Sequence, residues 1–254
     1  MRRIALISAA ACLLAGLASA HSPFLLPNVF AAGDRDHVTV QGSFTEAFFA
    51  PDVAMKSDDY HVVGPDGAKT PVTPVYFKDV AILEVPLAAE GTYRISTGAR
   101  VGRTAKAYEK DGNWEFLEPG EAPPEGATAV DMVSLTSADV YVSKGKASEV
   151  PARGQGIELA PAKVGETAAG EPVTFRLLFE GQPLEGEAVA LHRAGETYSG
   201  AAPVEVKTGA DGAVTFTPAE AGVYLVMTRH RVGPEAEGGP HRSYTASVTF
   251  EVVP

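Results

Sequence analysis

Cysteine is almost absent from this sequence, since Cys12 is the only one among 254 residues. Apolar runs are short as well: the longest, from Ile4 to Leu17, falls short of the roughly 20 residues that a membrane-spanning helix needs. No window keeps a helical period of apolar residues over three turns. These absences exclude a disulfide framework and argue against helical bundles and helical membrane spans.

Residues 1–20 have the features of a secretory signal peptide. Arg2 and Arg3 precede the apolar run, which ends in the small-residue pattern Ala18-Ser19-Ala20. We expect cleavage after Ala20, so that the mature protein begins at His21 and is exported to the periplasm. Because Cys12 leaves with the signal peptide, the mature chain forms no disulfide and depends on core burial or a metal for stability.

The charge of the chain is strongly acidic, with a formal net charge of −11 from 21 Lys and Arg against 32 Asp and Glu. Residues 1–20 hold two of the basic residues and none of the acidic ones, so the mature protein carries −13. The acidic residues are scattered, which argues against nucleic acid or an anionic membrane as a partner. The pattern fits a protein that meets cations, and equally an ordinary acidic exported protein.

The composition predicts an all-β fold. The 26 Gly and 19 Pro separate short stretches rich in Val, Thr, Phe and Tyr, at the spacing typical of an immunoglobulin-like sandwich. A polar segment near residue 150 divides them, so we expect two small β-sandwiches, residues 21–149 and residues 150–254. The predicted strands cover 37–44, 61–64, 74–77, 80–85, 91–97, 172–180, 188–192, 204–208, 213–217, 222–231 and 243–252, and the stretch 156–161 opens the second unit.

One segment of the first half is too polar and too rich in Pro and Gly to form core. It runs from Lys106 to Thr128 and carries Trp114, the single tryptophan of the chain. We expect a long surface loop here.

Three stretches of the second half resemble the transthyretin-like or carboxypeptidase-regulatory-like sandwich: 179–189, 208–216 and 221–225. Together with a signal peptide that ends directly before a histidine, and with the stretches 44–51 and 157–161, they resemble an uncharacterised-domain family of bacterial periplasmic proteins described as nickel or cobalt uptake accessory components. The resemblance implies periplasmic metal handling beside a membrane metal transporter or an outer-membrane receptor.

His21 supplies the chemistry for such a role. As the first residue of the mature chain it offers its α-amine and its imidazole Nδ1, which can close a chelate ring on one ion. Nitrogen donors suit Ni, Co, Cu or Zn better than Ca or Mg. Pro23 excludes a square-planar site built from the first three residues, because its nitrogen has no proton to lose. Further ligands must therefore come from elsewhere in the fold.

The other histidines are the first choice for those ligands. His230 and His241 stand at opposite ends of the Gly- and Pro-rich loop 232–240, and a hairpin there would bring them together. His192 ends a predicted strand and is the next candidate. Each of these histidines can equally be a solvated or hydrogen-bonded side chain. Other available residues, which no spacing selects, are His37, His61, Glu46, Met55 and Met227.

Three functions follow from these observations. The first is a periplasmic transition-metal-binding accessory protein that uses His21 with His230, His241 or His192. The second is a metal-free binding or adhesion module whose loops, including the one with Trp114, contact a protein or glycan. The third is a copper oxygenase with a histidine brace. The sequence contains no GxSxG or HExxH motif, and we assign no catalytic residue.

Overall fold

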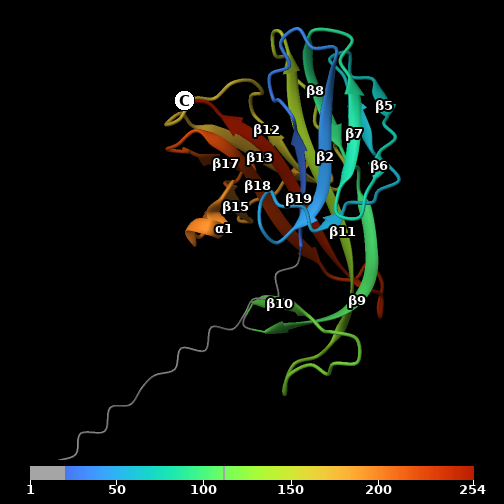
Figure 1. Ribbon diagram of the computed structural model, residues 1–254. Coiled ribbons are helices and arrows are strands. Elements are labelled where there is room, and N and C mark those ends of the chain that lie inside the picture. Colours follow the sequence, from blue (N-terminus) through green and yellow to red (C-terminus); the bar gives the residue numbers. More distant parts are fainter. Residues whose placement is uncertain (1–20, 111) are drawn as a thin grey trace, which may run out of the picture.

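The computed structural model describes residues 21–110 and 112–254, and the predicted signal peptide lies outside the described residues. The described chain is all-β apart from one short helix, α1 (Glu196–Ser199), which confirms the predicted class (Figure 1). No helix in this part of the chain is long and apolar enough to cross a membrane.

The strands form three sheets. The five-stranded sheet contains β1 (Ser22–Pro27), β2 (His37–Thr45), β3 (Val53–Ala54), β6 (Val75–Tyr76) and β7 (Ala81–Pro86). The four-stranded sheet contains β12 (Ile157–Pro161), β13 (Val173–Phe179), β14 (Gln182–Pro183) and β17 (Ala213–Phe216). The ten-stranded sheet contains β4 (His61–Val63), β5 (Lys69–Pro71), β8 (Gly91–Ser96), β9 (Arg100–Lys110), β10 (Asn113–Phe116), β11 (Val130–Lys144), β15 (Ala188–Arg193), β16 (Val204–Lys207), β18 (Gly222–Val232) and β19 (His241–Val252).

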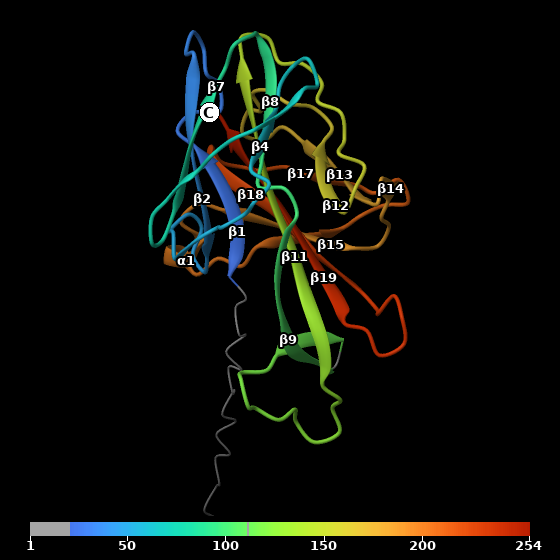
Figure 2. The same cartoon turned by 90° about the vertical axis from the view of Figure 1, so that its right-hand side faces the viewer.

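The ten-stranded sheet runs through both halves of the chain because β11 and β19 pair in parallel, from Met132 with His241 to Val140 with Thr249. The sequence did not predict this pairing, since neither the full length of β11 nor any parallel contact follows from local pattern. Figure 2 shows β11 and β19 side by side along much of their length.

The two smaller sheets cover opposite faces of the ten-stranded sheet. Side chains alternate between faces along a strand, and cross-strand partners share a face. On β11, Ala138 and Val140 belong to the first hydrophobic cluster, beneath the five-stranded sheet. On β19, Ala246 and Val248 belong to the second cluster, beneath the four-stranded sheet. Because Ala138 pairs with Ser247, these two pairs point to opposite sides.

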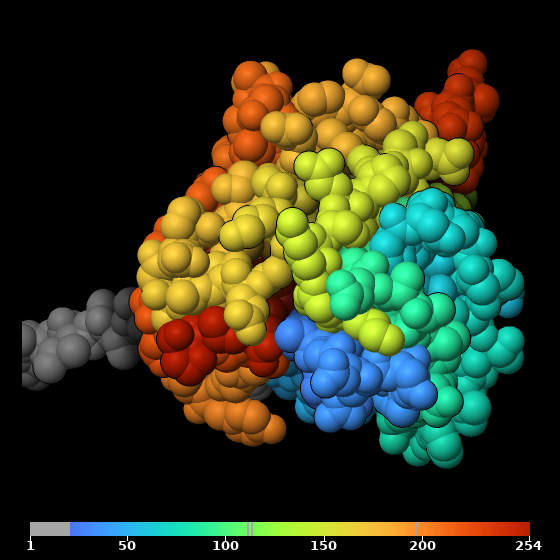
Figure 3. Space-filling view, turned by 90° about the horizontal axis from the view of Figure 1, so that it is seen from above, coloured from blue at the N-terminus to red at the C-terminus, as the bar shows by residue number. Residues whose placement is uncertain are grey.

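We call the side that carries Ser243, Thr245 and Ser247 the β1 face, because the hydroxyl of Ser247 donates a hydrogen bond to the carbonyl of Pro23 in β1 at 2.8 Å. The side that carries Tyr244, Ala246 and Val248 is the β13 face. In the view from above, the two halves of the chain form adjoining lobes, with residues from about 140 to 150 at their junction (Figure 3).

β1 was not among the predicted strands. It pairs antiparallel with β2 along its whole length, and Phe24 and Leu25 are fully buried. The predicted surface loop Lys106–Thr128 contains the end of β9 and all of β10, which form a hairpin that projects beyond the two sandwiches (Figures 1 and 2). Trp114 packs against His241, with ring centroids 5.3 Å apart.

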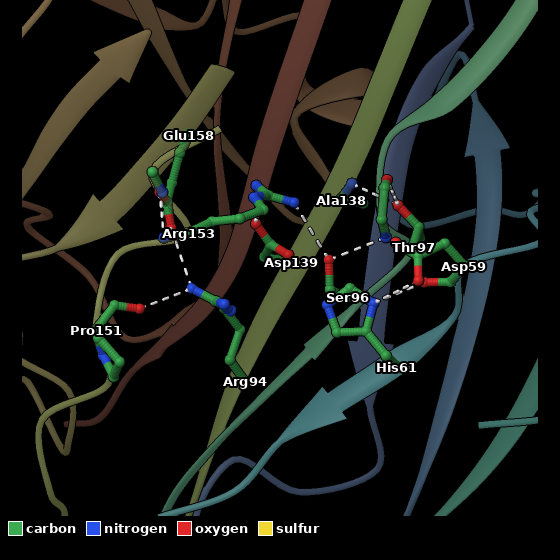
Figure 4. A network of polar contacts seen from close by, with 12 residues as sticks. Asp59, His61, Arg94, Ser96, Thr97, Ala138, Asp139, Pro151, Arg153 and Glu158 are labelled. Carbon is green, nitrogen blue, oxygen red and sulfur yellow. Dashed lines mark hydrogen bonds and ion pairs between the residues drawn. The ribbon is translucent and has the colours of Figure 1, made fainter. Parts of the chain in front are cut away.

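Buried charges tie the two halves together on the side away from β1 (Figure 4). Arg94 of β8 donates to Glu158 of β12 at 3.1 Å, and only 6% and 1% of these side chains are exposed. Glu158 also accepts hydrogen bonds from the backbone N–H groups of Arg153 and Gly154. The Arg153 guanidinium donates to Asp139 of β11 at 3.0 Å. The network therefore holds the connection between the halves against β8, β11 and β12.

Replacing Arg94 with methionine should lower the free energy of unfolding by about 3 kcal/mol, because it leaves the Glu158 carboxylate buried without its cation. Urea denaturation of the purified protein measures this difference. Lys69→Met is the matched control: Lys69 pairs with Asp59 at 2.7 Å, but both side chains are half-exposed, so the loss should stay below about 1 kcal/mol. Equal losses in the two variants would contradict the assigned role of the Arg94–Glu158 pair.

Candidate functional site

His21 lies directly before β1, at the edge where β1 meets the end of β2. Ser22 pairs with Thr45, so residue 21 comes opposite residue 46. The Nε2 atom of His21 is 3.7 Å from Oε1 of Glu46, and both side chains are about half-exposed. The first residue of the predicted mature chain therefore sits beside a carboxylate.

The backbone next to His21 is firmly held. Pro23 accepts the hydrogen bond from Ser247, and Phe24 packs edge-to-face on Phe49 at a centroid distance of 5.2 Å. Phe24 and Leu25 are completely buried. An α-amine at His21 would consequently occupy a defined position rather than the end of a loose tail.

The segment that carries Glu46 is also fixed by hydrogen bonds. The hydroxyl of buried Thr45 donates toward the carbonyls of Ala47 and Ala50, at 2.7 and 2.5 Å. The backbone N–H of Glu46 donates to the carboxylate of Asp52 at 2.7 Å. This closed turn holds the Glu46 backbone in place, so the carboxylate has only its own side-chain rotations to lose on binding an ion.

An open groove with a volume of about 930 Å³ begins at His21 and runs beneath the β9–β10 hairpin. Arg100, Arg103 and Lys106 of β9 line it together with carboxylate and apolar side chains. The Arg100 guanidinium lies over the Phe44 ring, 5.3 Å from the centroid, and its Nε donates to the carbonyl of Lys56. Ligands larger than a bare ion can therefore approach His21 from this side.

His192 lies on the β1 face, because its partner Leu225 pairs in turn with Thr249. Its ring packs on Phe48 with centroids 4.9 Å apart, and its Nδ1 is 3.6 Å from Oε2 of Glu196. Burial lowers the pKa of His192 and, as the largest cause, raises the pKa of Glu196. The surroundings thus disfavour the charged form of each side chain.

The loop 232–240 does connect a hairpin, but the register separates the two histidines at its ends. His230 pairs with Tyr244, three residues along β19 from His241. An odd offset places His230 on the β13 face and His241 on the β1 face. His230 binds Glu187 through Nδ1 at 2.6 Å and packs on Phe179, while His241 packs on Trp114.

Among the described residues, no ion pair or ring contact joins His21 to His192, His230 or His241. His192 and His241 share one face of the sheet, but their rows on β19, at Thr249 and at residue 241, are eight residues or about 27 Å apart, so these two histidines do not lie beside each other. Within residues 21–110 and 112–254, no group of three His, Cys, Asp or Glu side chains is placed to hold a metal ion. That His230, His241 or His192 binds the same ion as His21 stays a prediction.

The remaining candidates have other surroundings. His61 is buried, lies within 2.7 Å of the carbonyl of Asp59 through Nδ1, and has its pKa lowered mainly by burial. His37 contacts Asp36, and Met55 is fully buried in the first hydrophobic cluster. Glu46 is the donor next to His21 that the sequence listed without selecting. The sequence did contain a signal for this pair of residues: the apolar run 24–26 indicates a strand, and pairing that strand with β2 places residue 46 beside residue 21.

The described donors at this edge are therefore an imidazole and one carboxylate, to which cleavage after Ala20 would add an amine. Three such donors can hold a divalent transition metal ion and leave further coordination positions open.

A family model described as a domain of unknown function, DUF4198, matches residues 18–232. No curated protein matches the chain significantly. Among solved structures, trypsin-activated α2-macroglobulin from Escherichia coli is similar at 14% identity and a TM-score of 0.24, over 92% of this chain and 16% of that one. The FN1–FN3 domains of chicken CNTN1 match at 7% identity and a TM-score of 0.25, over 92% and 99%. The D00–D0 domain of intimin matches at 13% identity and a TM-score of 0.23, over 91% and 100%.

Burial of His192 predicts a pH dependence of stability. Its pKa is lowered in the folded protein, whereas an unfolded chain binds the proton at the ordinary value of about 6.5. The unfolded state therefore gains protons first, and the free energy of unfolding falls as the pH drops through about 6.5 towards the folded-state pKa. His192→Gln should reduce this fall, measured by urea denaturation in the presence of a chelator. An identical fall in the variant would contradict the prediction.

Proposed function

The chain belongs to the family described as a domain of unknown function, DUF4198, and we propose that it is a periplasmic accessory protein that binds a transition metal ion through its mature N-terminus. The proposal rests on one observation: His21 Nε2 lies 3.7 Å from Glu46 Oε1 at the rigid start of β1. Signal-peptide cleavage after Ala20 would create a chelating amine beside this pair.

The donor set favours particular metals. An amine, an imidazole and a carboxylate suit Cu(II), Ni(II), Co(II) and Zn(II), whereas Ca and Mg prefer oxygen ligands alone. The amine and the imidazole must both be deprotonated to bind, so affinity should increase with pH through the range where they titrate.

The openness of the site favours uptake and transfer over permanent storage. His21 and Glu46 are about half-exposed, and the adjoining groove leaves one side of the site accessible. A bound ion keeps positions that a second protein can occupy during transfer. We propose that the receiving partner is a membrane metal transporter or an outer-membrane receptor.

A copper oxygenase with a histidine brace has less support. A brace needs a second imidazole beside the N-terminal histidine, and the donor found beside His21 is the carboxylate of Glu46. Among the described residues, no ion pair or ring contact joins His192 or His241 to His21; their rings pack instead on Phe48 and Trp114.

Blocking the amine should abolish tight binding. A protein whose His21 α-amine is acetylated should bind Cu(II) and Ni(II) at least about tenfold more weakly than the protein with a free amine at His21, because the acetylated nitrogen is no longer a donor and the chelate ring cannot close. Titration calorimetry with each metal measures the difference. Glu46→Gln should also weaken binding, since it removes the anionic oxygen.

Glu84→Gln provides the matched control, because Glu84 is an exposed residue of β7 in the same sheet. It should bind both metals as the unaltered protein does. If acetylation of the α-amine leaves both affinities unchanged, the metal proposal is wrong.

A further inference from the structure

The β1 face of β18 carries two arginines that the site described so far does not use. Arg229 and Arg231 are two residues apart on one strand, so both point to the same side. Arg231 pairs with Ser243 and Arg229 with Thr245, which places both on the β1 face. An arginine pair within a chain of net charge −11 stands out as a local concentration of positive charge.

Neither guanidinium forms an ion pair with any carboxylate in the part of the chain that the structure describes. Arg229 donates from Nε to the hydroxyl of Thr245 at 3.2 Å. The Nε of Arg231 is buried and has no hydrogen-bond partner among the described residues. The charge of Glu187 also acts on Arg231, but that carboxylate is bound to His230 at 2.6 Å.

Burial lowers the pKa of both arginines, and each is only partly exposed. Two neighbouring cations that have lost part of their hydration are costly to the folded protein unless an anion compensates them. Guanidinium groups present paired N–H donors that match the two oxygens of a carboxylate.

A row of polar residues connects Arg231 to the groove that His21 lines. Ser134 of β11 pairs with Ser243, which pairs with Arg231, so the three residues form one row across three strands. Ser134 and His21 line the same groove. The row spans two strand spacings, or about 10 Å.

β1 lies against the ten-stranded sheet and runs in the same direction as β11 and β19. Residue 31, just beyond β1, bridges Ser143 in parallel, and Pro23 contacts Ser247. β1 therefore runs alongside β11 and β19 in the same direction, and His21 lies further towards Ser243 than Pro23 does.

From this arrangement we propose that Arg229 and Arg231 bind the carboxylates of a small polycarboxylate chelator, so that the metal reaches His21 as a chelate complex. The inference rests on the proposed function for its metal, but the arginine site itself is independent of the N-terminal amine. His21 and Glu46 hold the ion, and the arginines bind carboxylate oxygens of the chelator that face β18.

Calorimetry with citrate as the probe tests the arginine site. The metal-free protein that begins at His21 should bind citrate, and Arg229→Gln and Arg231→Gln should each weaken that binding about tenfold. Arg242→Gln is the matched control, because Arg242 belongs to the same hairpin but lies on the β13 face, where it pairs with Glu235. Citrate binding that is unchanged in both test variants, or equally reduced in the control, overturns the inference.

Two further titrations separate this inference from the proposed function. Ni(II) alone should bind the arginine variants as it binds the unaltered protein, and acetylation of the His21 α-amine should weaken Ni(II) binding while leaving citrate binding intact. The 1:1 Ni(II)–citrate complex should bind the unaltered protein at least about fivefold more tightly than citrate does, and acetylation of the His21 α-amine should remove that gain.

If the Ni(II)–citrate complex binds no more tightly than citrate alone, the chelate inference is wrong, even when Ni(II) alone binds. The proposed function is wrong, by contrast, if the affinity for Ni(II) does not depend on a free α-amine at His21. Should a glutamine variant fail to fold, as judged by its urea midpoint, Arg229→Lys and Arg231→Lys keep the charge without the paired donors and should still weaken citrate binding.

Discussion

β11 and β19 run parallel from Met132 and His241 to Val140 and Thr249, and this pairing joins strands from the two halves of the chain into one sheet. Because side chains alternate along each strand, the shared sheet has to present one apolar surface to each smaller sheet. The first hydrophobic cluster takes Ala138 and Val140 on the β1 face, and the second takes Ala246 and Val248 on the β13 face. The arrangement of both sandwiches follows from this register.

The same register determines what lies near His21. The five-stranded sheet covers only part of the β1 face, so the adjoining stretch of β18 and β19 carries polar residues such as Arg229, Arg231 and Ser243. β1 rests against this stretch through the hydrogen bond between Ser247 and Pro23. On the other side of the sheet, the buried Arg94–Glu158 pair fixes the connection between the halves. A rigid scaffold of this kind keeps His21 and Glu46 in place without a disulfide.

Much of the fold could be predicted from local pattern. The alternation of apolar and polar residues located β2, β7 and β13 close to their observed bounds, because each is more buried on one face than on the other. β18 and β19 lack this alternation and were located instead as stretches rich in Val, Thr and Tyr between turn residues. β1 was missed because it is buried along most of its length and shows little alternation. The full extent of β11 was missed because its burial changes along the strand as its neighbours change from β9 to β8.

The sequence by itself determined the all-β class, the acidic charge and the choice of His21, since each follows from composition or from residues adjacent in the chain. Only the tertiary structure decided which side chain lies beside His21 and on which faces the other histidines lie. Strand pairing places Glu46 beside it, and an odd offset along β19 puts His230 and His241 on opposite faces. A one-residue change of register exchanges the two faces of a strand, and register depends on long-range packing that no local pattern records.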